Sequence, residues 1–167
     1  EIAATKVALG LNPEEKFAMP ADVLAHARLV KERGAKVRKE WDTKFATWQT
    51  TNPEQAKLLA RLRTKALPAG WDADIPTFAP GKEVATRAAS GQVINAIAKH
   101  LPEFWGGSSD LAGSNNTSIE GGGSFLPSSS AIKGAHPYGR IIHFGIREHA
   151  MGSILNGIAL HGLTRSF

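Results

Sequence analysis

The stretch IIHFGIREHAMGSILNGIALHG (residues 141–162) joins a strand pattern to a helix pattern through a single glycine. Its mostly apolar start stops at the turn signal Gly145, which predicts a short strand at about residues 140–144. From Arg147 to His161 apolar side chains return every three or four residues, which predicts a helix closed by Gly162. Strand, glycine turn and helix in this order indicate an α/β unit.

The predicted helix carries a carboxylate, Glu148, in its first turn, although the rest of the helix has the small and apolar residues of a buried element. In open α/β sheets the first turn of such a helix lies at the carboxyl end of the preceding strand, where ligands bind. A glutamate there can complement the helix dipole and bond a free backbone N–H, for about 0.3–1 kcal/mol. It can also act as a buried acid that hydrogen-bonds or protonates a heterocycle nitrogen. The residues alone leave both interpretations open.

The rest of the chain divides into three parts. Residues 1–66 are dominated by helical patterns, including a helix that ends near Gly10 and helices that begin near Pro20 and Pro53, and we interpret them as the end of one domain. Residues 67–83 hold three prolines and no sustained period, which is typical of a linker. Residues 84–167 start a second domain with a helix, a short buried strand, a loop rich in Gly, Ser and Asn over about residues 106–139, and the strand and helix quoted above. This order predicts an α/β domain with a mostly parallel sheet, of which only the first part is present.

Composition narrows the possible partners. The chain of 167 residues has a formal net charge of +5, but its basic residues alternate with acidic ones along helical segments. Solvated helix faces have this pattern, so we expect no nucleic-acid partner, and an anionic substrate such as a sugar phosphate suits a basic site better. The sequence has no apolar run long enough for a membrane span and no signal peptide, so we expect no membrane partner.

Metal and disulfide chemistry are also limited by the sequence. The absence of cysteine excludes disulfides and thiolate metal sites, and it is compatible with the cytoplasmic location that we expect. The histidines near the quoted stretch are spaced so that no pair shares one helical turn, and we therefore predict no metal site among these residues.

Three segments occur in an order that resembles transketolase, a family of thiamine diphosphate enzymes: ATRAAS (residues 85–90), GGSSDLAGSN (residues 106–115) and GIREHAM (residues 145–151). The opening EIAATK (residues 1–6) resembles a further segment of that family. The resemblance implies an incomplete thiamine diphosphate-binding fold. Residues 1–66 would be the C-terminal helical end of the diphosphate-binding domain, residues 67–83 the linker, and residues 84–167 the start of the pyrimidine-binding domain.

The resemblance also implies roles for four residues. Glu148 would be catalytic, contacting the cofactor ring nitrogen N1′, and Asp110 would lie by the cofactor at the subunit interface. Arg87 and Ser114 would bind the substrate phosphate, although Ala88 stands where the family commonly has lysine. From the residues alone, the alternatives are a surface ion pair for Arg87, a turn hydroxyl for Ser114 and an Asx-turn for Asp110.

The function implied by the resemblance is transfer of a two-carbon ketol unit from a ketose phosphate to an aldose phosphate through a thiamine diphosphate carbanion, in the pentose phosphate pathway. The expected form is a homodimer with the active site at the subunit interface. The family's diphosphate and magnesium motif is absent from these residues, so we expect the Mg²⁺ ligands elsewhere in a longer protein and predict that this chain alone is inactive. The alternatives are another thiamine diphosphate enzyme, such as deoxyxylulose phosphate synthase or a ketoacid dehydrogenase component, and a non-catalytic dimerisation module.

Overall fold

The structure is a computed structural model that describes all residues from Glu1 to Phe167 and forms two compact units, Glu1–Pro53 and Glu54–Phe167. The first unit holds helices α1 (Ile2–Ala8) and α2 (Ala21–Thr51). Gly10 follows α1 with a φ of +72°, which confirms the predicted glycine closure. The helix α2 runs unbroken through Gly34 for 31 residues. The chain contains no helix that is both long and apolar enough to cross a membrane.

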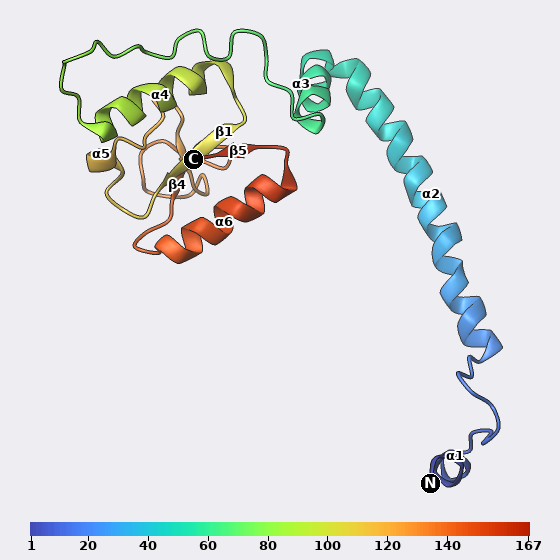
Figure 1. Cartoon of the computed structure of the whole chain (residues 1–167). Coiled ribbons are helices and arrows are strands. Elements are labelled where there is room, and N and C mark those ends of the chain that lie inside the picture. The colour runs from blue at the N-terminus through green and yellow to red at the C-terminus, as the bar shows by residue number, and fades with distance from the viewer. The chain divides into compact units, whose positions relative to one another are not determined.

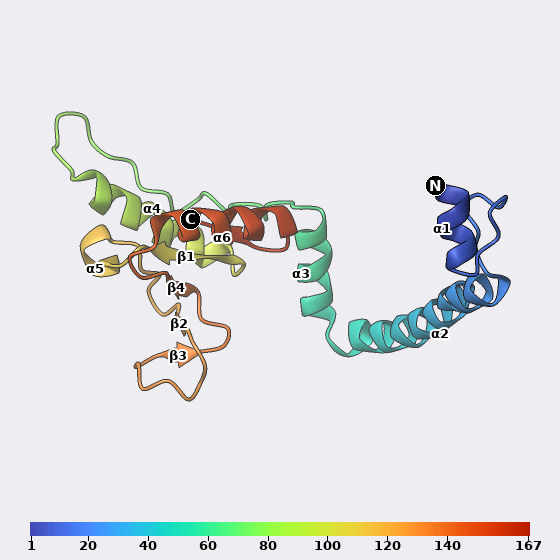
Figure 2. The ribbon, with the colours of Figure 1, turned by 90° about the horizontal axis from the view of Figure 1, so that it is seen from below.

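The second compact unit contains a parallel sheet with a helix on each face. The sheet order is β3-β2-β4-β1-β5, and every neighbouring pair is parallel. Figure 1 shows α4 and α6 on opposite faces of this sheet, and in Figure 2 the strands β4, β2 and β3 follow one another away from β1. The predicted parallel α/β domain is confirmed. Its elements are α3 (Pro53–Arg63), α4 (Thr86–His100), β1 (Phe104–Ser108), α5 (Ala112–Asn115), β2 (Ser124–Phe125), β3 (Ala135–His136), β4 (Ile141–His143), α6 (Glu148–His161) and β5 (Arg165–Ser166).

The core of this unit lies between α4 and the sheet. Ile94 and Ala98 of α4 pack with Ile119 of the following loop, and Phe104 and Phe167 close the cluster. Burial of these side chains from water is the main force that holds α4 on the sheet. The core therefore fixes β1, whose carboxyl end leads to the segment with Asp110.

The segment at residues 106–139 is more ordered than we predicted. After the predicted strand β1 it contains the short helix α5 and the two-residue strands β2 and β3, where we predicted only a loop. Strands of two residues carry no alternating pattern, so they are recognisable only through their pairing, β2 with β4 and β3 with β2. The prediction of one continuous loop over about residues 106–139 was therefore wrong.

The helix α6 also differs from the expectation of a buried element. None of its residues is buried, and Ile154 and Leu160 are 49% and 85% exposed. The helix lies against the sheet near β5, and the side chains of Ile154 and Leu160 stay exposed within residues 1–167. Its apolar composition therefore exceeds what packing within this chain requires.

The boundary between the compact units lies earlier in the chain than the predicted linker. The helix α3 begins at this boundary and lies in the same compact unit as the sheet. The domain limits at residues 66, 67, 83 and 84 concern a longer protein, and they stay predictions.

Candidate functional site

The two predicted site carboxylates lie at one edge of the sheet. Strands β1 and β4 are parallel neighbours, with Ser108 opposite His143 where both strands end. Asp110 is the second residue after β1, and Glu148 opens α6 after the turn that follows β4. The structure thus brings Asp110 and Glu148 to the same carboxyl edge, as we predicted for Glu148 from the strand, turn and helix pattern.

The chain also changes direction at this edge. After β1 it continues to β2, which lies on the far side of β4, and after β4 it continues through α6 to β5, which lies on the far side of β1. Neighbouring parallel strands whose connections leave in opposite directions form a topological switch point, and α/β sheets bind ligands in the crevice outside it. Asp110 and Glu148 stand on the two sides of this switch point.

The turn after β1 has an unusual backbone. Asp110 and Leu111 both adopt left-handed conformations, with φ of 70° and 54°. Such conformations cost non-glycine residues on the order of 1–3 kcal/mol each and are concentrated at functional sites. The Ser108 hydroxyl donates a hydrogen bond to the Asp110 carbonyl oxygen (2.5 Å), and the Asp110 N–H donates to the Ser108 carbonyl oxygen (2.9 Å). This turn was not predicted, because neither of its left-handed residues is a glycine.

The turn before α6 presents Glu148 to solvent. Gly145 has a φ of +65°, and the Arg147 N–H donates to the Gly145 carbonyl oxygen (2.8 Å). No side chain caps the start of α6. Glu148 therefore does not bond a free backbone N–H, as it would if it only capped the helix. The Glu148 side chain is exposed. Residues 1–167 thus do not bury it, although the alternative of a buried acid assumed that they would. Its carboxylate is available to a ligand or to a second chain.

The two predicted phosphate-binding residues lie on helices that touch each other. Arg87 is in the first turn of α4, and Ser114 is in α5, which packs against α4. The contact is close at Gly91, where an added Cβ would lie 2.8 Å from the Cβ of Asn116. This close approach brings the start of α4 and α5 together (Figure 1).

All four predicted site side chains are exposed, and no hydrogen bond or ion pair within residues 1–167 engages them: Arg87, Asp110, Ser114 and Glu148. The surface ion pair proposed as the alternative for Arg87 is therefore not formed. Leu111 directly follows Asp110, and Ile146 lies two residues before Glu148; we did not predict either, and both have exposed apolar side chains (65% and 77% exposed). Carboxylates flanked by apolar surface suit a flat, nitrogen-containing ring. No group of three or more His, Asp or Glu side chains in the chain could hold a metal ion.

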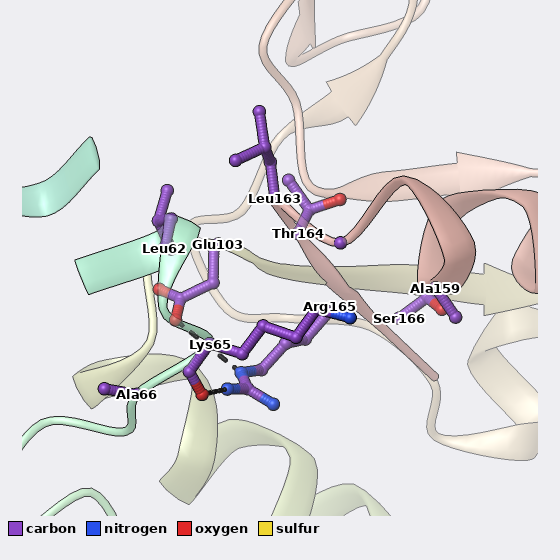
Figure 3. A pocket seen from close by; sticks show the side chains of 10 residues that line it. Leu62, Lys65, Ala66, Glu103, Ala159, Leu163, Thr164, Arg165 and Ser166 are labelled. Atoms are coloured by element: carbon purple, nitrogen blue, oxygen red, sulfur yellow. Dashed lines mark hydrogen bonds and ion pairs between the residues drawn. The ribbon is translucent and has the colours of Figure 1, made fainter. Parts of the chain in front are cut away.

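A second polar cluster lies at the opposite, amino edge of the sheet. Glu103, just before β1, accepts two hydrogen bonds from the Arg61 guanidinium (2.7 and 2.8 Å), and the Arg165 guanidinium lies 3.8 Å away. The Glu103 side chain is only 2% exposed. Arg165 also donates to the Lys65 carbonyl oxygen (2.6 Å), as Figure 3 shows beside a cavity of about 310 Å³. This cluster fastens α3 and β5 to the start of β1.

The pKa of Glu103 reflects two opposed effects. Burial alone raises the pKa of this carboxyl, but the hydrogen bonds from Arg61 and the charges of Arg61 and Arg165 together hold it below its ordinary value of 4.5. Because its pKa is lower in the folded than in the unfolded state, the charged Glu103 carboxylate stabilises the fold at pH values above the pKa of the unfolded state. That contribution is lost as the pH falls through the pKa of the folded state.

We expect Glu103→Gln to lower the free energy of unfolding at pH 7 by about 1–3 kcal/mol, because Arg61 loses its charged partner. We expect the parent to lose stability as the pH falls below about 4.5. This loss should be smaller in the variant, which has no carboxyl group to protonate at position 103. Denaturant unfolding of the full-length protein between pH 3 and 7, with the exposed Glu54→Gln as control, measures both effects. Equal stability of Glu103→Gln and the parent at pH 7 would contradict the importance of this cluster.

Comparison with known proteins identifies two domain families in the chain. Residues 1–68 match the family model "Transketolase, thiamine diphosphate binding domain", and residues 82–167 match "Transketolase, pyrimidine binding domain". Among curated relatives, the transketolase of Mycobacterium tuberculosis H37Rv is 52% identical over 170 aligned residues and that of Geobacillus stearothermophilus 46% identical over 168. Each alignment covers 100% of this chain and 24% of the relative, so the chain spans about a quarter of the length of these relatives.

Solved structures give the same result. A transketolase complex with sedoheptulose 7-phosphate from Pichia stipitis has a TM-score of 0.81 and 39% identity over 97% of this chain and 24% of that one. The transketolase of Leishmania mexicana has a TM-score of 0.82 and 32% identity over 99% of this chain and 24% of its own. Both solved structures are therefore similar to this chain in fold and in sequence.

Proposed function

Because the chain belongs to the transketolase family, we propose that the protein of which it is part is a transketolase, which transfers a two-carbon ketol unit from a ketose phosphate to an aldose phosphate. One observation carries the proposal. Asp110 and Glu148 follow the neighbouring parallel strands β1 and β4, and both side chains are exposed and unpartnered at the switch point of the sheet. A sheet edge of this kind is where α/β proteins hold their ligands.

Thiamine diphosphate, when bound, supplies a nucleophilic carbon that carries the two-carbon unit. Glu148 would hydrogen-bond the ring nitrogen N1′ and hold a proton at that atom, which is general acid–base work suited to a carboxyl group. Asp110 would contact the cofactor from the adjacent strand. The exposed side chains of Leu111 and Ile146 would exclude water from the ring. The pyrimidine half of the cofactor is thus the half that this chain fits.

We propose that residues of the helices α4 and α5 bind the substrate phosphate. Arg87 offers a planar fork of N–H donors, and Ser114 offers a hydroxyl on the neighbouring helix. The related structure with bound sedoheptulose 7-phosphate supports sugar phosphates as the substrate class. Ala88 removes a positive charge that the family commonly places beside the arginine, so Arg87 would carry more of the phosphate binding.

The remaining parts of the site are proposed to come from residues outside this chain. We place there the ligands of Mg²⁺ and of the diphosphate, since none of the carboxylates and histidines in this chain gather into a metal-binding group. A homodimer with the active site at the subunit interface agrees with the exposure of Glu148 and of the apolar residues of α6. We further propose a cytoplasmic role in the pentose phosphate pathway.

Ketol transfer by the full-length protein is the direct test. Xylulose 5-phosphate and ribose 5-phosphate are incubated with the protein, with and without thiamine diphosphate and Mg²⁺, and the sugar phosphate products are separated and quantified. We expect transfer only with the cofactor, and none from residues 1–167 alone. Cofactor binding without transfer would overturn the proposal. Condensation of pyruvate with glyceraldehyde 3-phosphate instead would favour the deoxyxylulose phosphate synthase alternative.

Arg87→Ala should raise the KM for sugar phosphates by about 10–100-fold, because a charge-assisted hydrogen bond is worth about 1.5–3 kcal/mol. The KM for an unphosphorylated ketose such as erythrulose should stay nearly constant. Steady-state kinetics of the full-length variant measure both, and Lys133→Ala, which removes an exposed positive charge elsewhere in the domain, is the control. An equal rise in KM for both ketoses would exclude Arg87 as a phosphate ligand.

A further inference from the structure

The turn between β4 and α6 is closed by the side chain of one of its own residues. The Arg147 guanidinium donates a hydrogen bond from Nη1 to the carbonyl oxygen of Phe144 (2.9 Å). Phe144 is itself fixed, because its side chain is only 5% exposed. An added Cβ on Gly145 would overlap Nη1, which shows that the guanidinium lies directly against this glycine. The turn thus folds around the Arg147 side chain.

The backbone of Arg147 joins the same turn to the helix. Its N–H donates to the Gly145 carbonyl oxygen (2.8 Å), and its carbonyl oxygen accepts from the Met151 N–H (2.8 Å). Arg147 is therefore both the last residue of the turn and the N-cap of α6, and Glu148 follows it directly. No capping side chain fixes this helix start, so the Arg147 side chain is the group that ties the first turn of α6 to the end of β4.

The other side-chain contacts near this edge hold different segments. The His143 Nε2 atom lies 2.9 Å from the Ser124 hydroxyl and links β4 to β2. The Ser108 hydroxyl holds the turn that carries Asp110. Neither contact reaches the residues between β4 and α6.

We propose that Arg147 is a positioning residue for Glu148, acting through its hydrogen bond to the Phe144 carbonyl oxygen. The inference rests on the proposed role of Glu148 at the cofactor ring. The bond fixes the direction in which α6 leaves the sheet, and with it the place of the Glu148 carboxylate. A misplacement of about 1 Å of a catalytic group can cost on the order of 10²-fold in rate, so loss of one bond in this turn has a measurable effect.

The experiment uses the full-length protein loaded with thiamine diphosphate and Mg²⁺. The first readout is the rate at which the cofactor C2 proton exchanges with deuterium in the absence of sugar, measured by acid quench and NMR. The second is backbone amide exchange at residues 145–151 in the protein without cofactor. The variants are Arg147→Ala, Arg147→Gln, Glu148→Ala and the control Lys133→Ala.

Arg147→Ala should slow C2 exchange by about 10–100-fold and speed amide exchange in the turn, with the KM for ketose phosphates unchanged within about twofold. Arg147→Gln keeps an N–H donor without the charge and should retain most of the parental rate if its amide reaches the Phe144 carbonyl oxygen. If Arg147→Ala fails to fold, Arg147→Met, which keeps the apolar stem and removes the donors, replaces it. Lys133→Ala should match the parent in both readouts.

Two results would overturn the inference while the proposed role of Glu148 stands. In the first, Glu148→Ala slows C2 exchange but Arg147→Ala does not. In the second, Arg147→Ala leaves the amide exchange unchanged and raises the KM for ketose phosphates, which would make Arg147 a substrate ligand. If Glu148→Ala itself exchanges C2 at the parental rate, the proposed role of Glu148 fails, and the positioning role of Arg147 fails with it.

Discussion

Replacing Glu148 by alanine in the full-length protein is expected to lower kcat for ketol transfer by about 10²–10⁴-fold, the range that general acid–base groups contribute. Glu148 is exposed and unpartnered in the first turn of α6, so no partner within residues 1–167 loses a contact when the carboxylate is removed. The loss should therefore fall on the chemical step and on cofactor activation rather than on folding.

The same variant separates the catalytic from the structural interpretation of Glu148. A glutamate that only complements the helix dipole contributes about 0.3–1 kcal/mol, so its removal would lower the thermal midpoint slightly and leave kcat intact. We expect the opposite pattern, with Glu148→Gln as inactive as Glu148→Ala because an amide does not exchange a proton with N1′. Glu83→Ala, which removes an exposed carboxylate from the linker, should leave kcat unchanged. Steady-state kinetics and thermal unfolding of the three variants give the answer.

The sequence predicted those elements that have their own local signal. The strand, glycine turn and helix around Gly145 occur where expected, as α6 and β4 show, and the closure of α1 by Gly10 is confirmed. The parallel sheet followed from the alternation of helix and strand patterns. These features depend on residues that lie within a few positions of one another.

Features that depend on distant residues were not predicted. The strands β2 and β3 exist only through pairing with their neighbours in the sheet. The ion pair of Glu103 joins residues 42 positions apart, with no pattern that marks either partner. In the candidate site, Glu148 and Asp110 came from motifs, whereas the left-handed Leu111 and the Arg147 hydrogen bond depend on the geometry of two turns. The catalytic and binding roles of all four motif residues stay predictions.

Gly107→Ala is expected to have the largest effect on stability. Gly107 is buried in β1 opposite Ile142 of β4, and an added Cβ would overlap the Ile142 carbonyl oxygen. That oxygen belongs to the sheet backbone and cannot rotate away, so the two strands would have to separate. Overpacking in a well-packed interior costs typically 1–3 kcal/mol and occasionally more, and we expect about 3 kcal/mol or more here because backbone rather than a side chain must move.

Urea unfolding of the full-length protein measures the loss of stability in Gly107→Ala. The result also tests the placement of Asp110 and Glu148 in the candidate site. Gly34→Ala is the matched control, since Gly34 lies in α2 with open space around it and alanine there should stabilise the helix by about 0.5–1 kcal/mol. Strands β1 and β4 carry Asp110 and Glu148 to the same edge, so any Gly107→Ala protein that still folds should have lost ketol transfer as well. Parental stability of Gly107→Ala would mean that β1 and β4 are not in direct contact at this point, and the shared edge of the two carboxylates would lose its structural basis.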